Sequence, residues 1–83
     1  MFAISYEIDN TSLAKQKEIG NLLEGFSFHK IHEGAYITDA DNFINLFEAI
    51  NALKKIDWFR QSVRDIRAFR VENWSDFTQF IKE

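Results

Sequence analysis

The residues best suited to chemistry in this chain are basic side chains gathered in its second half. Positions 54 to 70 hold six of the ten Lys and Arg residues and only two acidic residues; the basic six are Lys54, Lys55, Arg60, Arg64, Arg67 and Arg70. This window carries a charge of +4, and because the whole chain carries −3, the rest carries −7. Arginine can bind a phosphate through two parallel hydrogen bonds. The pattern therefore favours a local phosphate-binding surface, or else solvated charges that pair with acids elsewhere.

A carboxylate near the start of the chain, Glu7, belongs to a segment in which apolar and polar residues alternate. Over residues 2–8, large apolar side chains occupy every even position, and Ser5 and Glu7 lie between them. A period of two predicts a strand with one face on a core, which leaves Glu7 on the opposite, open face. A carboxylate there can act as a base or bind Mg²⁺, or it can be an ordinary exposed strand residue.

The rest of the chain predicts the elements that position these side chains. Helical spacing of apolar residues predicts three helices. The first covers residues 13–25. The second begins at a cap formed by Asp39 or Asp41 and runs to about Ile56, and the third covers residues 76–82 after a cap at Ser75. Strand patterns cover residues 2–8, 26–31, 35–38 and 62–72. Turn and cap residues fill positions 9–12, and His32, Glu33 and Gly34 form a hairpin turn. In the last strand the alternation breaks between Ile66 and Phe69, which indicates a bulge or burial on both faces.

The order of these elements is βαββαβ with a short C-terminal element. Parallel strands joined through helices cross over right-handed. The fold class is therefore α+β, and we expect a ferredoxin-like sandwich in which two helices cover one face of a single antiparallel sheet. We expect one domain over residues 1–83, and its small size favours a homodimer.

Several classes of protein are excluded or disfavoured by what the chain lacks. It has no cysteine, which excludes disulfides and thiolate metal sites. It shows neither a Gly-rich phosphate loop nor a nucleophile elbow. No apolar run approaches the roughly 20 residues of a membrane span, and the first residues have no secretory signal pattern. We therefore expect a cytoplasmic protein that does not bind membranes.

Three segments of the second half give the chain a specific likeness. They are Asn45-Leu46-Phe47-Glu48-Ala49-Ile50-Asn51-Ala52-Leu53-Lys54 leading to Trp58, then Ser62-Val63-Arg64-Asp65-Ile66-Arg67-Ala68-Phe69-Arg70-Val71-Glu72, then Trp74-Ser75-Asp76-Phe77-Thr78. Together they closely resemble the second half of the virulence-associated protein D family. The N-terminal Met1-Phe2-Ala3-Ile4 and the hairpin Gly34-Ala35-Tyr36 also look like that family.

The resemblance implies properties that composition and spacing do not show. Members of the family have a ferredoxin-like fold similar to that of CRISPR-associated protein 2, and form symmetric dimers. They are described as endoribonucleases, often toxins paired with an antitoxin protein. Their proposed catalytic residue is an Asp at the end of the first strand, facing the dimer cleft with a divalent metal. This chain has Glu7 at that position, and Gly34-Ala35 where the family usually has Gly-Ser.

The resemblance points to Glu7, and the chemistry of other residue types suggests further roles beside it. Glu7 is expected as the base or as a ligand of a divalent metal, Mg²⁺, and Arg64 and Arg67 as the other catalytic residues, holding the RNA phosphate. Tyr36 and Arg70 are expected to bind substrate, Tyr36 by stacking on a base. In the other interpretation, the arginines pair with acids and Tyr36 packs across the sheet. The expected partners are RNA, a second copy and an antitoxin. The alternative function is a catalytically weakened homologue that acts as an RNA- or protein-binding dimeric module.

Overall fold

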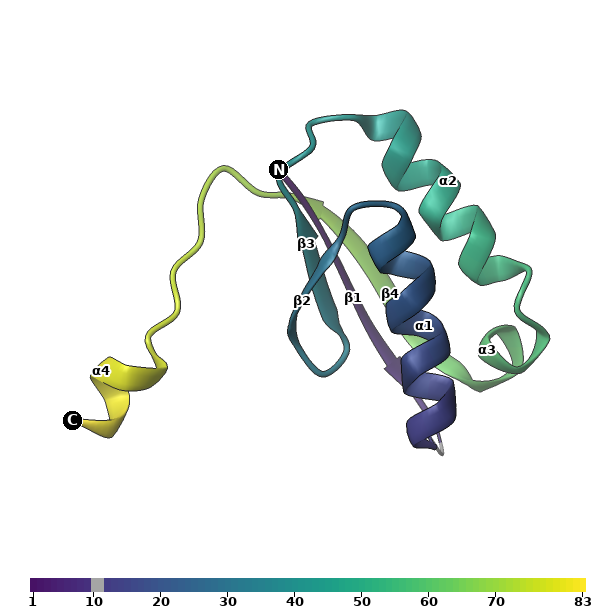
Figure 1. Cartoon of the computed structure of the whole chain (residues 1–83), viewed down its shortest axis with the longest axis horizontal. Coiled ribbons are helices and arrows are strands. Elements are labelled where there is room, and N and C mark those ends of the chain that lie inside the picture. The colour runs from purple at the N-terminus through teal and green to yellow at the C-terminus, as the bar shows by residue number, and fades with distance from the viewer. Residues whose placement is uncertain (10–11) are drawn as a thin grey trace.

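A four-stranded antiparallel sheet with strand order β2-β3-β1-β4 forms the centre of the fold (Figure 1). The computed structural model describes residues 1–9 and 12–83. Its strands are β1 (Phe2–Ile8), β2 (His29–His32), β3 (Ala35–Thr38) and β4 (Val63–Arg70). Its helices are α1 (Leu13–Gly25), α2 (Phe43–Lys54), α3 (Asp57–Ser62) and α4 (Thr78–Lys82). This is the predicted ferredoxin-like α+β order, with α3 as an addition.

The core lies between one face of the sheet and the two long helices. The even-numbered side chains Phe2, Ile4 and Tyr6 of β1 are buried in one cluster with residues from both helices. The helix residues in this cluster are Ile19 and Leu23 of α1 and Leu46, Ala49 and Leu53 of α2. Full burial of an Ile or Leu side chain contributes about 1.5–3 kcal/mol. Both helices therefore cover one face, and the prediction that Glu7 lies on the open face is confirmed.

The helix starts follow side-chain caps, and one of them differs from the prediction. Ser12 caps α1 by accepting a hydrogen bond from the Lys15 backbone N–H at 3.2 Å; positions 10 and 11 of the expected cap segment lie outside the described residues. Asn42 caps α2, accepting from two backbone N–H groups at 3.0 and 3.2 Å. The predicted cap at Asp39 or Asp41 is wrong, because the Asp41 carboxylate pairs with Arg70 instead.

Two boundaries in the middle of the chain also differ. The second strand begins at His29, three residues after the predicted start, because Ser27 adopts a left-handed φ of 68° that ends the preceding turn. The second helix ends at Lys54, and the short helix α3 follows. The ring of Phe59 in α3 packs edge-on against Tyr6, with centroids 5.7 Å apart. Burial of this one ring fixes a helix too short for its periodicity to be recognised.

A bulge lies in β4, but not where the sequence pattern places it. Residues 65–70 pair with β1 without interruption, and the register shifts between Glu7 opposite Asp65 and Ile8 opposite Val63. Arg64 is therefore the extra residue. The broken alternation between Ile66 and Phe69 has another cause, since Phe69 is an apolar residue on the open face, opposite Ala3.

The segment after β4, residues 71–83, extends away from the body and is called the C-terminal arm here (Figure 1). Its Val71 N–H donates to the Met1 carbonyl at 2.8 Å, and residues 74–78 pass beside Ile31 and His32 of β2. The helix α4 starts at Thr78, where Asp76 accepts the Thr78 N–H at 2.9 Å, so the predicted cap at Ser75 is wrong. Among the described residues, no helix has the length and apolar character needed to cross a membrane.

Candidate active site

Two carboxylates meet at one end of the open face. Glu7, at the end of β1, lies directly opposite Asp65 of β4 in the antiparallel register. Their side chains are 71% and 43% exposed, so both can reach a ligand in solvent. Like charges directly opposite each other on neighbouring strands are destabilising. The pair therefore needs cations close by.

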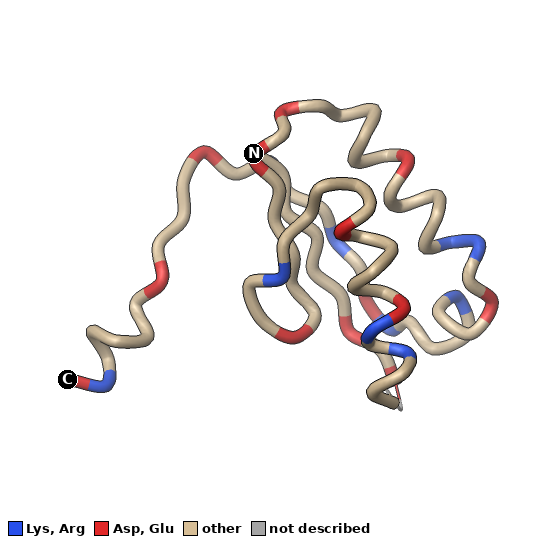
Figure 2. Tube along the Cα trace, in the orientation of Figure 1, with Lys and Arg blue, Asp and Glu red and all other residues tan. Residues whose placement is uncertain are grey.

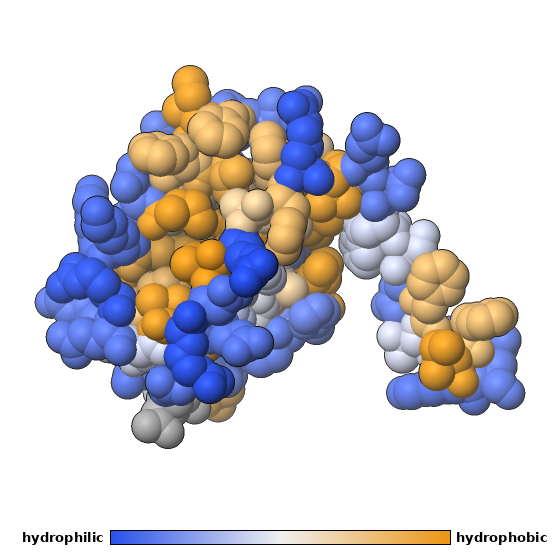
Figure 3. All heavy atoms as spheres, turned by 180° about the vertical axis from the view of Figure 1, so that it is seen from behind, coloured by the Kyte–Doolittle hydropathy of each residue, from blue (hydrophilic) through white to orange (hydrophobic). Residues whose placement is uncertain are grey.

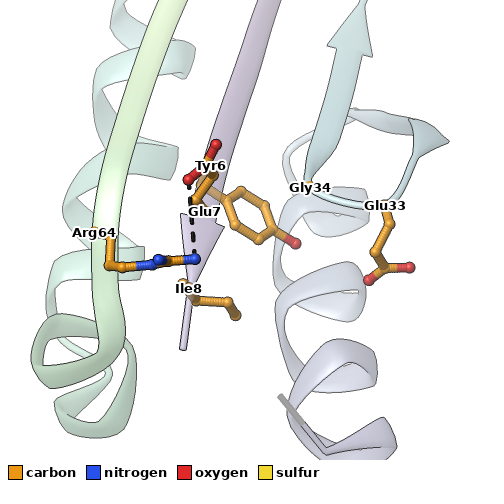
Figure 4. Close-up of a pocket in the computed structure, with 6 residues that line it drawn as sticks. All are labelled: Tyr6, Glu7, Ile8, Glu33, Gly34 and Arg64. Carbon is orange, nitrogen blue, oxygen red and sulfur yellow. Dashed lines mark ion pairs between the residues drawn. The ribbon is translucent and has the colours of Figure 1, made fainter. Parts of the chain in front are cut away.

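Two arginines supply those cations. Arg67 Nε donates to both oxygens of Asp65, at 3.1 and 3.2 Å. Arg64 Nε lies 2.9 Å from Asp9 Oδ1, and its Nη2 lies 4.0 Å from Glu7 Oε2 (Figure 4). The bulge gives Arg64 this position, because an extra residue re-aims side chains relative to the regular pleat. These five side chains form an exposed cluster, called the charged end here, with three carboxylates and two guanidinium groups.

A shallow hollow of about 200 Å³ opens beside the charged end. It is lined by Tyr6, Glu7, Ile8, Glu33, Gly34 and Arg64 (Figure 4). The hairpin turn closes against β1 here, since the Tyr6 N–H donates to the Gly34 carbonyl at 2.8 Å. Gly34 has a φ of +78°, and a Cβ at this position would lie 2.6 Å from the backbone carbonyl oxygen of Tyr6. Only glycine fits this turn without strain.

The two tyrosines near the hollow are not general bases. Burial raises the pKa of the Tyr6 hydroxyl, and the nearby Tyr36 and Glu33 raise it further. Burial also raises the pKa of Tyr36. The two rings stack at a centroid distance of 6.4 Å. Both phenols therefore keep their protons near neutral pH, and their main role is in packing.

The structure separates Tyr36 and Arg70 from the other expected site residues. Tyr36 is only 3% exposed and faces the helices, so its ring cannot stack on a base, and that expectation is corrected. Arg70 lies opposite Phe2, five residues or about 17 Å along β1 from Glu7. Its guanidinium donates to both oxygens of Asp41 at 2.7 Å. Glu7, Arg64 and Arg67 do come together at the charged end.

The basic window of the sequence does not form a separate positive surface. Each of its four arginines has an acidic neighbour in the structure: Arg60 with Asp57, Arg64 with Asp9 and Glu7, Arg67 with Asp65, and Arg70 with Asp41. Figure 2 shows acidic and basic positions interspersed over the body. Exposed ion pairs of this kind contribute about 0–1 kcal/mol each. An incoming phosphate can therefore compete for these guanidinium groups at small cost.

The charged end suits a hard divalent cation that keeps most of its water. Among the described residues, no group of three or more His, Asp or Glu side chains is arranged to hold a metal. Mg²⁺ is commonly bound by one or two carboxylates together with waters and substrate phosphates. Glu7 and Asp65 match that donor set. From the sequence alone, Asp65 is a second carboxylate candidate whose favoured role is to orient a neighbouring arginine, and it does bind Arg67. Its position directly opposite Glu7 follows from the strand register, which the sequence does not show.

Comparison with known proteins finds close relatives, although no family model matches. "Endoribonuclease VapD" of Dichelobacter nodosus is 40% identical over 91 aligned positions, covering 99% of this chain and 98% of that protein. "Endoribonuclease VapD homolog" of Neisseria gonorrhoeae is 42% identical, covering 99% of each. "Endoribonuclease VapD" of Haemophilus influenzae is 52% identical over 65 positions, covering 78% of this chain and 71% of that protein.

Proposed function

This chain belongs to the VapD family of endoribonucleases, and on that premise we propose that it cleaves RNA phosphodiester bonds at the charged end of its open face. The family relationship carries the reaction class. The observation that carries the location is the facing pair Glu7 and Asp65, with Arg64 and Arg67 beside it. In the described part of the chain, this is the only place where two carboxylates face each other across neighbouring strands.

The roles of the side chains follow from their chemistry. Glu7 takes the proton from the attacking oxygen, which belongs either to water or to the ribose 2′-hydroxyl. As the new P–O bond forms, the bond from phosphorus to the 5′ oxygen breaks, and solvent protonates that leaving oxygen. Arg64 and Arg67 bind the non-bridging oxygens and offset the negative charge that builds on the phosphate.

A divalent cation is part of this proposal. Glu7 and Asp65 would hold Mg²⁺, since both carboxylates are exposed and lie side by side. When bound, the ion supplies positive charge to the phosphate and lowers the pKa of its water. Glu7 has one more methylene than the Asp expected from the family resemblance. The exposed position at the strand end gives that longer side chain room to adjust.

The test is cleavage of a labelled RNA by the wild type and by Glu7→Gln, each with Mg²⁺ and with EDTA. We expect the wild type to cut only with the metal, and Glu7→Gln to lose about 10²–10⁴-fold in rate. Glu48→Gln, an exposed glutamate on α2, is the matched control and should cut like the wild type. Wild-type protein that leaves RNA intact with Mg²⁺ and Mn²⁺ near neutral pH would contradict the proposal. If only Glu7→Asp then cuts, the chain is the weakened homologue, a binding module.

A homodimer is supported by apolar side chains that a single chain leaves uncovered. The start of α2 exposes Phe43, Ile44 and Phe47, and α4 with its cap exposes Phe77, Phe80 and Ile81. Figure 3 shows apolar side chains gathered on the body and, apart from them, at the tip of the C-terminal arm. Contiguous exposed apolar surface of this kind marks protein contacts. Packing the arm of one copy onto the body of another would cover both groups.

We also propose an antitoxin protein as the inhibitor of this activity. To stop RNA cleavage, such a partner has to cover Glu7 or block the open face that leads to it. The charged end has a net charge of −1 from three carboxylates and two arginines, so a partner that binds it needs a basic contact. Copurification with the product of the neighbouring gene, followed by loss of cleavage in the complex, tests this partner.

A further inference from the structure

The side chain of Arg64 is not directed by the regular pleat of the sheet. The register shift between Glu7 and Ile8 makes Arg64 the extra residue of the bulge in β4. A bulged residue has no partner in the ladder of hydrogen bonds. Contacts of its own side chain therefore have to determine where its guanidinium group lies.

Asp9 follows β1 directly, next to this bulge, and its backbone is held in place. Its N–H donates to the carbonyl of Ser62 at 3.0 Å. Ser62 is the last residue of α3, and the Phe59 ring of that helix is only 3% exposed. The Asp9 backbone is thus tied to an element that is anchored in the core, although its carboxylate is exposed to solvent.

The Asp9 carboxylate holds Arg64 at one particular nitrogen. Arg64 Nε lies 2.9 Å from Asp9 Oδ1, whereas its Nη2 lies 4.0 Å from Glu7 Oε2 (Figure 4). The second distance is too long for a hydrogen bond. A guanidinium group is planar and rigid, so a partner at Nε restricts the directions of both Nη groups. The contact with Asp9 therefore leaves the Nη edge open to a ligand beside Glu7.

Arg64 also lines the hollow at the charged end, together with Glu7. In Figure 4 its side chain crosses from β4 toward the end of β1, with the guanidinium group beside Glu7. Glu7 is the other carboxylate that Arg64 approaches, so the two exposed side chains would pair directly if Asp9 were removed. Such a pair would occupy the proposed base and the proposed phosphate ligand at the same time.

We infer that Asp9 is a positioning residue, which holds Arg64 by Nε and so keeps its Nη groups directed at the scissile phosphate and apart from Glu7. This inference rests on the proposed function, which supplies the position of the phosphate. In this arrangement Asp9 touches neither the phosphate nor the attacking oxygen, and it acts through Arg64. The second arginine is held in a similar way, since Arg67 Nε donates to both oxygens of Asp65.

The test is a double-mutant cycle on cleavage of a labelled RNA with Mg²⁺, in which kcat and KM are measured separately. Its members are the wild type, Asp9→Ala, Arg64→Ala and the double variant. Asp9→Asn is added, because it removes the charge but keeps an acceptor oxygen for Nε. Asp57→Ala is the matched control, since Asp57 also pairs with an exposed arginine, at 2.8 Å, but does not belong to the charged end.

We expect Arg64→Ala to lower kcat about 10- to 150-fold, the range for loss of one charge-assisted contact. Asp9→Ala should lower kcat about fivefold, the upper value for an exposed ion pair, and leave KM close to the wild-type value. The double variant should cut no more slowly than Arg64→Ala, because Asp9 then has nothing to position. Asp9→Asn should recover most of the kcat, and Asp57→Ala should cut like the wild type.

A second measurement detects the contact without any cleavage. The Nε–H proton of Arg64 gives an NMR signal of its own, identified by its absence from Arg64→Ala. Its exchange with water should be about fivefold faster in Asp9→Ala than in the wild type, and unchanged in Asp57→Ala. The tie between Asp9 and Ser62 uses the backbone N–H, so the side-chain variant keeps it. Denaturation midpoints check that each variant is folded.

Three results would overturn the inference. If Asp9→Ala lowers KM and leaves kcat unchanged, Asp9 only repels the anionic RNA. If the losses of the two single variants multiply in the double variant, Asp9 acts independently of Arg64. An equal exchange rate of the Arg64 Nε–H in the wild type and in Asp9→Ala would show that Asp9 does not hold it.

The outcomes also separate this inference from the proposed function. A wild type that never cuts RNA, but whose Arg64 Nε–H exchanges more slowly than that of Asp9→Ala, contradicts the nuclease and keeps the contact with Asp9. A wild type that cuts RNA, with Asp9→Ala cutting at the same rate, keeps the nuclease and overturns the positioning role.

Discussion

At the scale of residues, the charged end works through competition between ion pairs. Asp65 faces Glu7 and pairs with Arg67, while Arg64 pairs with Asp9 and approaches Glu7 at 4.0 Å. In the absence of ligand, each arginine offsets a carboxylate. A cation on the carboxylates would release the arginines for phosphate, so metal and RNA should each favour binding of the other.

Removing the Asp65 carboxylate should raise the Mg²⁺ concentration needed for cleavage more than it lowers the maximal cleavage rate. We expect Asp65→Asn to need roughly tenfold more Mg²⁺ for half-maximal cleavage, because a charge-assisted contact contributes about 1.5–3 kcal/mol. Mg²⁺ titrations of the cleavage rate measure this shift. Asp57→Asn, an exposed carboxylate paired with Arg60 on α3, is the control. Equal midpoints for Asp65→Asn and the wild type would remove Asp65 from the metal site.

The buried tyrosine of β1 predicts a loss of stability at high pH. Burial raises the pKa of Tyr6 above its ordinary value of 10.0, so the folded protein holds this proton more tightly than the unfolded chain. Its contribution is therefore complete below pH 10 and is lost as the pH rises toward the folded pKa. The free energy of unfolding should fall there by up to about 1.4 kcal/mol per pH unit.

Urea unfolding at pH 8 and at pH 11 checks this, with Tyr6→Phe as the comparison. The variant should lose less stability between the two pH values, because only Tyr36 and the surface groups still titrate. Lysines also lose their charge in this range, so the difference between wild type and variant is the quantity to measure. A parallel decline in both proteins would show that Tyr6 does not cause it.

At the scale of elements, the sequence predicts strands and long helices well where one pattern repeats. β1, α1 and β3 follow their predicted limits because alternation, a helical stripe or a hairpin turn marks each. The helix α3 was missed, because six residues are too few for a period and its formation depends on Phe59 reaching the core. Glu7, Arg64 and Arg67 were predicted to act together, but the partnership with Asp65 depends on register, which one sequence does not encode visibly.

The hairpin turn beside the site offers a test of backbone strain. Gly34→Ala should destabilise the fold by roughly 1–3 kcal/mol. The residue needs a φ of +78°, and its Cβ would lie 2.6 Å from the backbone carbonyl oxygen of Tyr6. Gly25→Ala is the matched control, since a Cβ there meets nothing within 4 Å. Denaturation midpoints measure both. If the two variants unfold at the same urea concentration, the close approach of the turn to β1 is not what Gly34 provides.

At the scale of the whole molecule, two surfaces have different characters. The helix side and the C-terminal arm leave large apolar side chains uncovered, whereas the open face is made mostly of small, polar and charged ones. Apolar contacts suit a permanent partner, and a hydrated face suits a substrate that must leave. A dimer formed through the helix side and the arm would differ from the family arrangement described above, in which the carboxylate at the end of the first strand faces the dimer cleft.

The exposed apolar side chains of the C-terminal arm are therefore expected to hold the two copies of the dimer together. Phe80→Ser together with Ile81→Ser should convert a dimer into a monomer at micromolar concentration, because burial of such side chains contributes about 1.5–3 kcal/mol each. Analytical ultracentrifugation measures the mass. Leu13→Ser, an equally exposed apolar position on α1, should leave the dimer intact. If the double variant has the same mass as the wild type, the arm does not hold the copies together.

The pairing of β1 with β4 also affects the making of the protein. These neighbouring strands lie near opposite ends of the described chain, so Phe2 pairs with Arg70, and Asp65 follows Glu7 by 58 residues. At about 5–20 residues per second, a ribosome needs roughly 3–12 s to bridge that interval. Throughout this time the growing chain carries Glu7 without Arg64, Asp65 or Arg67. Because the charged end is complete only after β4 has been synthesised, the growing chain cannot cleave the mRNA that encodes it before that point.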